Sequence, residues 1–134
     1  MKNVLATIAG FIAASIIVYI FETLIGHNLF PLPEGSEPMN MEWIKNNMDK
    51  IPTGSKTFVV IGHFTGIICG MLIAGFISKT SMIPAYIVGI LMVAATVFNI
   101  VVLPKELWFS LSDGILAIAA FFFGKSLAQR YVFD

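Results

Sequence analysis

Long apolar runs with few polar interruptions make up most of this chain. Three of them, at about residues 3–25, 57–78 and 82–103, are each close to the roughly 20 residues that an α-helix needs to cross the hydrocarbon core of a bilayer. A fourth run, at about 107–128, is interrupted by Asp113 and Lys125 but is otherwise continuous in its apolar character. The pattern predicts an all-α membrane protein with four transmembrane helices.

The connections between these runs predict how the helices are ordered. Residues 79–81 and 104–106 are too few to do more than join neighbouring antiparallel helices, so we expect an up-down-up-down bundle. The remaining connection, residues 26–56, is a long outer loop. We expect residues 1–134 to form a single transmembrane domain.

Part of the outer loop has the pattern of a short amphipathic helix. Pro38 suits its first turn, and Pro52 and Gly54 are expected to end it. Between them apolar side chains recur at helical spacing, at Met41, Ile44, Met48 and Ile51. This helix is either a connector on the membrane surface or a lid over the polar residues described next.

Each predicted span carries one strongly polar residue. These residues are Glu22, His63, Asn99 and Asp113. If the helices alternate in direction, all four lie roughly 5 to 9 Å below the same edge of the hydrocarbon. Ionisable groups are costly in hydrocarbon and usually face one another or a wet cavity. The sequence therefore predicts a buried polar layer near one membrane surface, which is a candidate ligand or proton site.

Two further residues are candidates for this layer. Tyr19 shares a helical stripe with Glu22. His27 follows five residues after Glu22, where it either contacts water and lipid headgroups or brings a second imidazole into the layer.

Small residues share the helical faces of the polar residues or, in the case of Gly62, belong to the same Gly-x-x-x-Gly repeat. They are Gly62, Gly66, Gly70, Gly89, Ala117 and Gly124. Small side chains let helix backbones approach closely in membranes, so we expect these faces to pack against protein. The repeated Gly-x-x-x-Gly pattern makes the second span the expected central helix, although such a motif also fits dimerisation.

The layer permits several roles. Two carboxylates and an imidazole in a medium of low dielectric constant are expected to share protons and not to carry three full charges. They could hold the helices together by hydrogen bonds, carry protons, or bind a cation. We expect no metal site, because only His63 is a strong transition-metal ligand and no ligand spacing is recognisable.

Composition and charge support a membrane location. The chain is 57% hydrophobic and 12% charged, far more apolar than an ordinary soluble domain. Glu22 stands where a signal-peptide cleavage region would begin, so we expect the first run to be a retained span. The single cysteine, Cys69, lies inside a span and allows no intramolecular disulfide.

The basic residues divide equally between the two predicted sides. One side has Lys2, Lys79, Lys125 and Arg130, and the other has Lys45, Lys50, Lys56 and Lys105. The first set lies in short loops or at helix ends, where the positive-inside rule counts most. Both termini are therefore expected in the cytoplasm.

No motif predicts catalysis. The chain has no Gly-x-Ser-x-Gly, phosphate loop, His-Glu-x-x-His or Cys-x-x-Cys, so we expect neither an enzyme nor a cofactor, and no nucleic-acid partner. The favoured hypothesis is an accessory or structural subunit, either a homo-oligomer or part of a larger membrane complex. The alternative is a small transporter or channel for protons, a cation or a small solute.

The run from Glu22 through Gly26 and His27 to Pro31 and Pro33 precedes the long loop and the glycine-rich second span. With this layout the chain resembles uncharacterised small four-helix bacterial inner-membrane proteins. The resemblance implies a bacterial cytoplasmic membrane and no known activity.

Overall fold

The computed structural model describes residues 1–132, so the last two residues of the predicted domain lie outside the described part. It contains four long helices. The first runs as α1 (Lys2–Tyr19), a π-helix η1 (Ile20–Gly26) and a final turn α2 (His27–Leu29). The other three are α4 (Thr53–Ser78), α5 (Ile83–Val102) and α6 (Leu107–Val132).

All four helices are long and apolar enough to cross a membrane, counting Lys2–Leu29 as one. The predicted all-helical, four-span fold is therefore confirmed. The helix ends differ modestly from the prediction, because α4 begins at Thr53 and α6 continues to Val132. Four helices of this kind indicate a multi-pass membrane protein.

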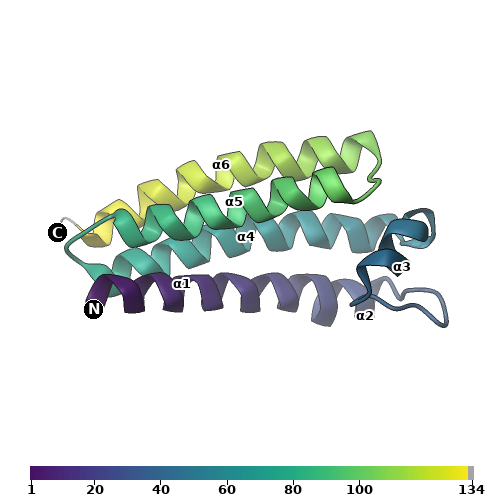
Figure 1. The fold of residues 1–134 in the computed structure, drawn as a ribbon, viewed down its shortest axis with the longest axis horizontal. Coiled ribbons are helices and arrows are strands. Elements are labelled where there is room, and N and C mark those ends of the chain that lie inside the picture. The colour runs from purple at the N-terminus through teal and green to yellow at the C-terminus, as the bar shows by residue number, and fades with distance from the viewer. Residues whose placement is uncertain (133–134) are drawn as a thin grey trace.

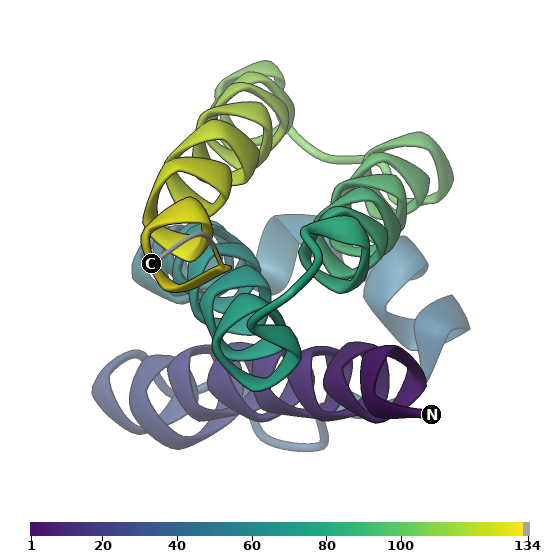
Figure 2. The same cartoon turned by 90° about the vertical axis from the view of Figure 1, so that its left-hand side faces the viewer.

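Helix α4 lies at the centre of the bundle (Figure 2). It packs against α1, α5 and α6, while α1 lies across the bundle in the end-on view. Both termini lie at one end of the molecule, and the long loop with α3 lies at the other (Figure 1). The ends of α1 and α5 and the starts of α4 and α6 consequently meet beside the long loop, which is where the predicted polar residues are.

Glycines on α4 allow α1 to approach closely. A methyl group placed at Gly70 would lie 2.7 Å from the Cβ of Ala14, and one at Gly66 would lie 3.0 Å from the Ala14 carbonyl oxygen. A methyl group at Gly62 would lie 3.1 Å from the Cβ of Phe21. The Gly-x-x-x-Gly face predicted for helix contact is thus occupied by α1 of the same chain.

Glycines also shape the centre of the core. The thioether of Met71 sits between α5 and α6, where methyl groups at Gly89 and Gly124 would lie 2.6 and 2.8 Å from its sulfur. Met71 is fully buried and Ala117 is 1% exposed. All six small residues singled out in the sequence are buried. This part of the bundle is a tightly packed apolar core.

The long loop contains α3 (Met41–Asn46) and a 3₁₀ turn η2 (Met48–Lys50). The side chain of Asn40 caps α3 by accepting hydrogen bonds from the backbone N–H groups of Glu42 and Trp43, at 3.0 and 3.2 Å. The predicted amphipathic helix is therefore present, but it is shorter than expected.

The predicted end of that helix is wrong. Pro52 is the N-cap of α4, with the extended backbone that proline accepts, and Gly54 lies inside the first turn of α4. The proline thus starts the next helix and does not end the previous one. Ile44 of α3, Met48 of η2 and the following Ile51 pack in a cluster with Val60, Leu103 and Phe109.

Candidate functional site

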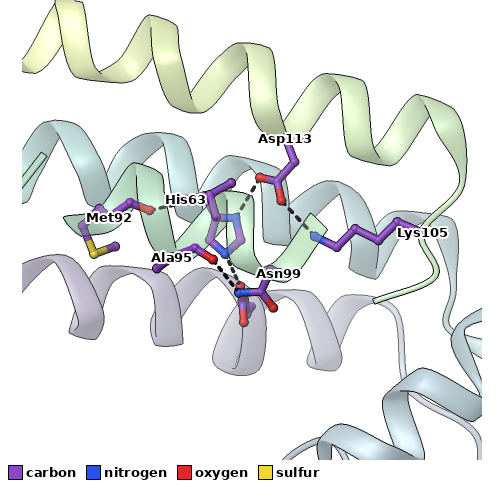
Figure 3. Close-up of polar contacts among 8 residues, drawn as sticks. His63, Met92, Ala95, Asn99, Lys105 and Asp113 are labelled. Atoms are coloured by element: carbon purple, nitrogen blue, oxygen red, sulfur yellow. Dashed lines mark hydrogen bonds and ion pairs between the residues drawn. The ribbon is translucent and has the colours of Figure 1, made fainter. Parts of the chain in front are cut away.

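A continuous line of charged side chains joins three helices near the loop end of the bundle (Figure 3). His63 of α4 is at its centre. Its Nδ1 lies 2.7 Å from Oδ1 of Asp113 on α6, and its Nε2 lies 3.2 Å from Oε1 of Glu22 in the π-helix. The side chain of Asp113 is 0% exposed, that of His63 10%, and that of Glu22 30%. The structure thus brings together three of the predicted polar residues.

Lys105 extends this line and was not predicted to belong to it. It lies in the connection between α5 and α6, and its Nζ is 3.0 Å from Oδ2 of Asp113. Its side chain is 2% exposed, and its ammonium sits 4.3 Å above the centre of the Phe109 ring. The basic residue eight positions before a buried aspartate was the available signal, but sequence spacing alone does not show that a loop residue turns inward.

The contacts determine where protons are held. Asp113 is buried and faces two basic groups, and each of them stabilises its carboxylate by donating to it. Lys105 donates to one oxygen, and His63 donates from Nδ1 to the other. The Nε2 atom of His63 and Oε1 of Glu22 then share one proton, because two lone pairs would repel each other at 3.2 Å. The four groups, named here the Lys105–Asp113–His63–Glu22 chain, are neutral as a unit when that proton is present.

The π-helix determines where the Glu22 side chain lies. Glu22 is the third residue of η1, whose hydrogen bonds close a wider turn than those of an α-helix. A wider turn changes the direction of the side chain relative to the α-helical stripe used to predict it. Such π segments often occur at functional sites.

A cavity of about 560 Å³ opens beside this chain of groups. Its walls come from the first helix, the long loop, α4, α5 and the start of α6 with the connection before it, and its volume is typical of small-molecule pockets. Glu22 and His63 line it, as do apolar residues including Val18, Met92 and Trp43 of α3. The cavity therefore combines mainly apolar walls with a few polar groups at one place.

The other predicted site residues line the cavity but are not members of the Lys105–Asp113–His63–Glu22 chain of side chains. Asn99 donates from its side-chain nitrogen to the carbonyl oxygen of Ala95, at 3.2 Å. Tyr19 is 51% exposed and His27 is partly buried, and both line the cavity wall. The structure thus places Asn99, Tyr19 and His27 around the cavity and gives Lys105 the fourth position in the chain of contacts.

A second ion pair lies at the same end of the bundle. Lys56, near the start of α4, pairs with Glu106 in the connection before α6. The Lys56 side chain is 3% exposed and that of Glu106 is 42% exposed. The hydrogen bond from the Lys56 ammonium lowers the pKa of the Glu106 carboxyl below its ordinary value. This contact joins the start of α4 to the α5–α6 connection next to the cavity.

The bundle beyond the cavity is apolar. Ile67, Met71 and Val88 are fully buried there. The next polar contact lies near the chain termini, where the Ser78 hydroxyl donates to Oδ1 of Asn3 at 2.9 Å. Within residues 1–132, no three His, Cys, Asp or Glu side chains are arranged to hold a metal ion. The cavity is thus a site at one end of the molecule.

The chain matches no protein-family model, no curated protein and no solved structure.

Proposed function

We propose that this protein is a membrane-integral binding protein, which takes a small, mainly apolar molecule into the cavity beside His63. The observation that carries the proposal is the position of Glu22 and His63 in the wall of an otherwise largely apolar cavity of about 560 Å³. Purely structural hydrogen bonding between helices needs no such space. Pockets of this size with few polar groups are typical of small-molecule sites.

The apolar core supports a binding role over conduction by a single copy. A channel or proton path needs polar groups or water across the whole hydrocarbon layer. The buried residues between the cavity and the terminal end include Ile67, Met71 and Val88, which offer no hydrogen bonds. Transport of a solute would therefore need a second copy or a large rearrangement. Binding needs neither.

The membrane location and orientation are part of the proposal. We place the chain in a bacterial cytoplasmic membrane with both termini in the cytoplasm. The basic residues near the terminal end support this orientation, because short cytoplasmic connections are enriched in lysine and arginine. They are Lys2, Lys79, Lys125 and Arg130. The cavity then faces the opposite compartment.

We further propose that the protein serves as an accessory subunit or homo-oligomer. The Gly62, Gly66 and Gly70 face cannot form the contact between copies, because α1 covers it. Partners would instead contact the outward faces of α1, α5 or α6. The binding site itself is complete in one chain.

Trp43 offers a direct test of binding, because it lines the cavity and the chain has only one other tryptophan, Trp108. In a Trp108→Phe variant in phosphatidylcholine nanodiscs, a brominated phenylpropyl compound that enters the cavity should quench Trp43 fluorescence with a saturating concentration dependence. Quenching by simple partition into lipid rises without saturation. Absence of a saturating component for every polar head tested, amine, alcohol and acid, would refute the proposal.

A matched pair of variants locates the binding. Ala95 lines the cavity, whereas Ala94 lines a separate apolar groove between α5 and α6. In the same Trp108→Phe background, Ala95→Phe should fill the cavity and remove the saturating component, and Ala94→Phe should leave it unchanged. Equal effects of the two substitutions would place the probe elsewhere.

A further inference from the structure

The charged groups around the cavity differ in how well they are neutralised. Two lysines line it, and both are paired: Lys56 with Glu106, and Lys105 with Asp113. Their charges are therefore already balanced by carboxylates of the same chain. A negatively charged ligand would find no free ammonium there among the described residues.

Glu22 is in the opposite situation. Among the described residues its side chain has one polar partner, His63, and contacts it through Oε1. The side chain is 30% exposed and lines the cavity. Asp113 and Lys105 neutralise each other, so the only cation that could balance Glu22 within the chain is a protonated His63. Among the described residues, Glu22 is thus the only carboxylate that lines the cavity, and it has no lysine or arginine partner.

The surroundings of the cavity also favour a cation. The loop over its opening carries more acidic than basic residues, with Glu34, Glu37, Glu42 and Asp49 against Lys45 and Lys50. Fields of one sign near a cleft of low dielectric constant concentrate ions of the opposite sign. The lining also includes Trp43, whose aromatic face attracts cations. The long-range field and the local groups therefore select the same ligand charge.

From these observations we propose that the ligand is a small amphipathic monocation: an apolar body that carries a protonated amine. The ammonium pairs with the Glu22 carboxylate, and the apolar body lies along Val18, Met92 and Trp43. Binding involves no covalent step. In the bound state the ammonium replaces His63 as the cation next to Glu22, and the proton that His63 Nε2 shared with Glu22 passes to water. Asp113 keeps its contacts with Lys105 and with Nδ1 of the neutral His63. This inference rests on the proposed function, since it names the ligand class for the same cavity.

A matched series of probes tests the ligand class. The series is 3-(4-bromophenyl)propylamine, the corresponding propanol and the corresponding propanoic acid, which differ only in the polar head. Each is titrated against the full chain carrying Trp108→Phe, in phosphatidylcholine nanodiscs at pH 7. Quenching of Trp43 should saturate at a roughly tenfold lower concentration for the amine than for the alcohol, because charge-assisted hydrogen bonds are the stronger ones. The acid should bind most weakly.

The Glu22→Gln substitution identifies the selecting group. It keeps the size of the side chain and removes its charge, so it should lower the affinity for the amine about tenfold and leave that for the alcohol nearly unchanged. The comparison of the three probes on unsubstituted Glu22 decides the ligand class even where this variant fails to fold. Equal saturation by amine and alcohol, or tighter binding of the acid, would overturn the inference and leave the binding function standing. Absence of saturation by all three would overturn both.

Discussion

The two halves of α4 use the same kind of helix surface for opposite purposes. From Gly66 to Gly75 the helix lies so close to its neighbours that a single methyl group at Gly66, Gly70 or Gly75 would approach another atom within 3.0 Å. Nearer the loop, α4 carries Lys56 and His63 and borders a cavity. Close packing leaves no space beside the glycine-containing, C-terminal half of α4. Beside the half of α4 that carries Lys56 and His63, the first helix changes to a π-helix, and residues of the long loop line the cavity.

The contrast shows that the closely packed segment of α4 and the segment that borders the cavity occupy different parts of the same helix. The glycine half fixes the relative positions of α1, α5 and α6. In the polar half, side chains from those helices are therefore held at defined distances, although the adjacent cavity is not filled by side chains. Changes in the glycine half should therefore act on stability alone, and changes in the polar half should divide between stability and binding.

The strongest way to break the polar half is to remove its fully buried carboxylate. Asp113→Ala leaves Lys105 buried without a counter-ion, and should lower the free energy of unfolding by about 3–5 kcal/mol. Equilibrium unfolding in mixed micelles measures the change. The double variant Asp113→Ala, Lys105→Met should recover part of the loss, because it removes the unpaired charge. A loss below about 1 kcal/mol in the single variant would mean that Asp113 is not buried with its partners as described.

In the glycine half, a single methyl group should be enough to disturb packing. Gly70→Ala should destabilise the protein by about 1–3 kcal/mol, because its Cβ meets Ala14 and the backbone of Gly10. The matched control is Gly114→Ala on α6, where the nearest atom is the flexible end of Ile100 at 3.4 Å. Alanine there should be neutral or stabilising by about 0.5–1 kcal/mol from helix propensity. If both substitutions had the same effect in unfolding experiments, close α1–α4 packing would be excluded.

The Glu22→Gln substitution should weaken ligand binding while changing the free energy of unfolding very little. Its side chain is partly exposed, so Glu22→Gln should change the free energy of unfolding by less than about 1 kcal/mol. An amide still forms a hydrogen bond with His63, and Asp113 keeps both partners. The same unfolding measurements as for Asp113→Ala provide the comparison. A loss as large as that of Asp113→Ala would show that the line of four groups is a single structural unit and not a core pair with an accessible end.

The smallest expected effect concerns the Lys56–Glu106 pair and depends on pH. The lowered pKa of Glu106 means that the carboxylate is favoured in the folded state. Its contribution is therefore fully present above the ordinary carboxyl pKa of about 4.3, and is lost as pH falls through the lower folded value. Glu106→Gln should lower the stability by less than about 1 kcal/mol at pH 7, because the Glu106 side chain is 42% exposed and the glutamine oxygen still accepts a hydrogen bond from the Lys56 ammonium. The difference between the two proteins should shrink towards zero at strongly acidic pH.

Much of the fold could be read from the sequence, because the apolar runs and small residues act locally. The spans followed from hydropathy and length, and the glycine faces followed from helical spacing. Three members of the charged chain, Glu22, His63 and Asp113, could be found for a related reason. Ionisable groups at a similar depth in apolar helices have few alternatives to meeting one another.

The remaining features depend on geometry that sequence spacing does not contain. Lys105 was expected in an outer connection, and its long side chain reaches Asp113 only because the turn before α6 directs it inward. The π-helix at Ile20–Gly26 breaks the spacing on which the Glu22 stripe was based. Pro52 permits either a helix end or a helix start, and the extended backbone there selected the start of α4.

The pairing of Lys105 with Asp113 bears on how such a chain is assembled. Both residues belong to the same hairpin, formed by α5, its short connection and α6. The buried Asp113 therefore has its counter-ion, Lys105, within the same hairpin. An isolated aspartate at the centre of a span opposes insertion by about 2.5–3.5 kcal/mol, and Asp113, which lies near the start of α6, meets a smaller cost of the same kind. A hairpin that enters the bilayer already self-neutralised avoids part of this barrier, and it does so before α1 and α4 have docked. Insertion of the last two spans is therefore expected to depend less on the first two than it would without Lys105.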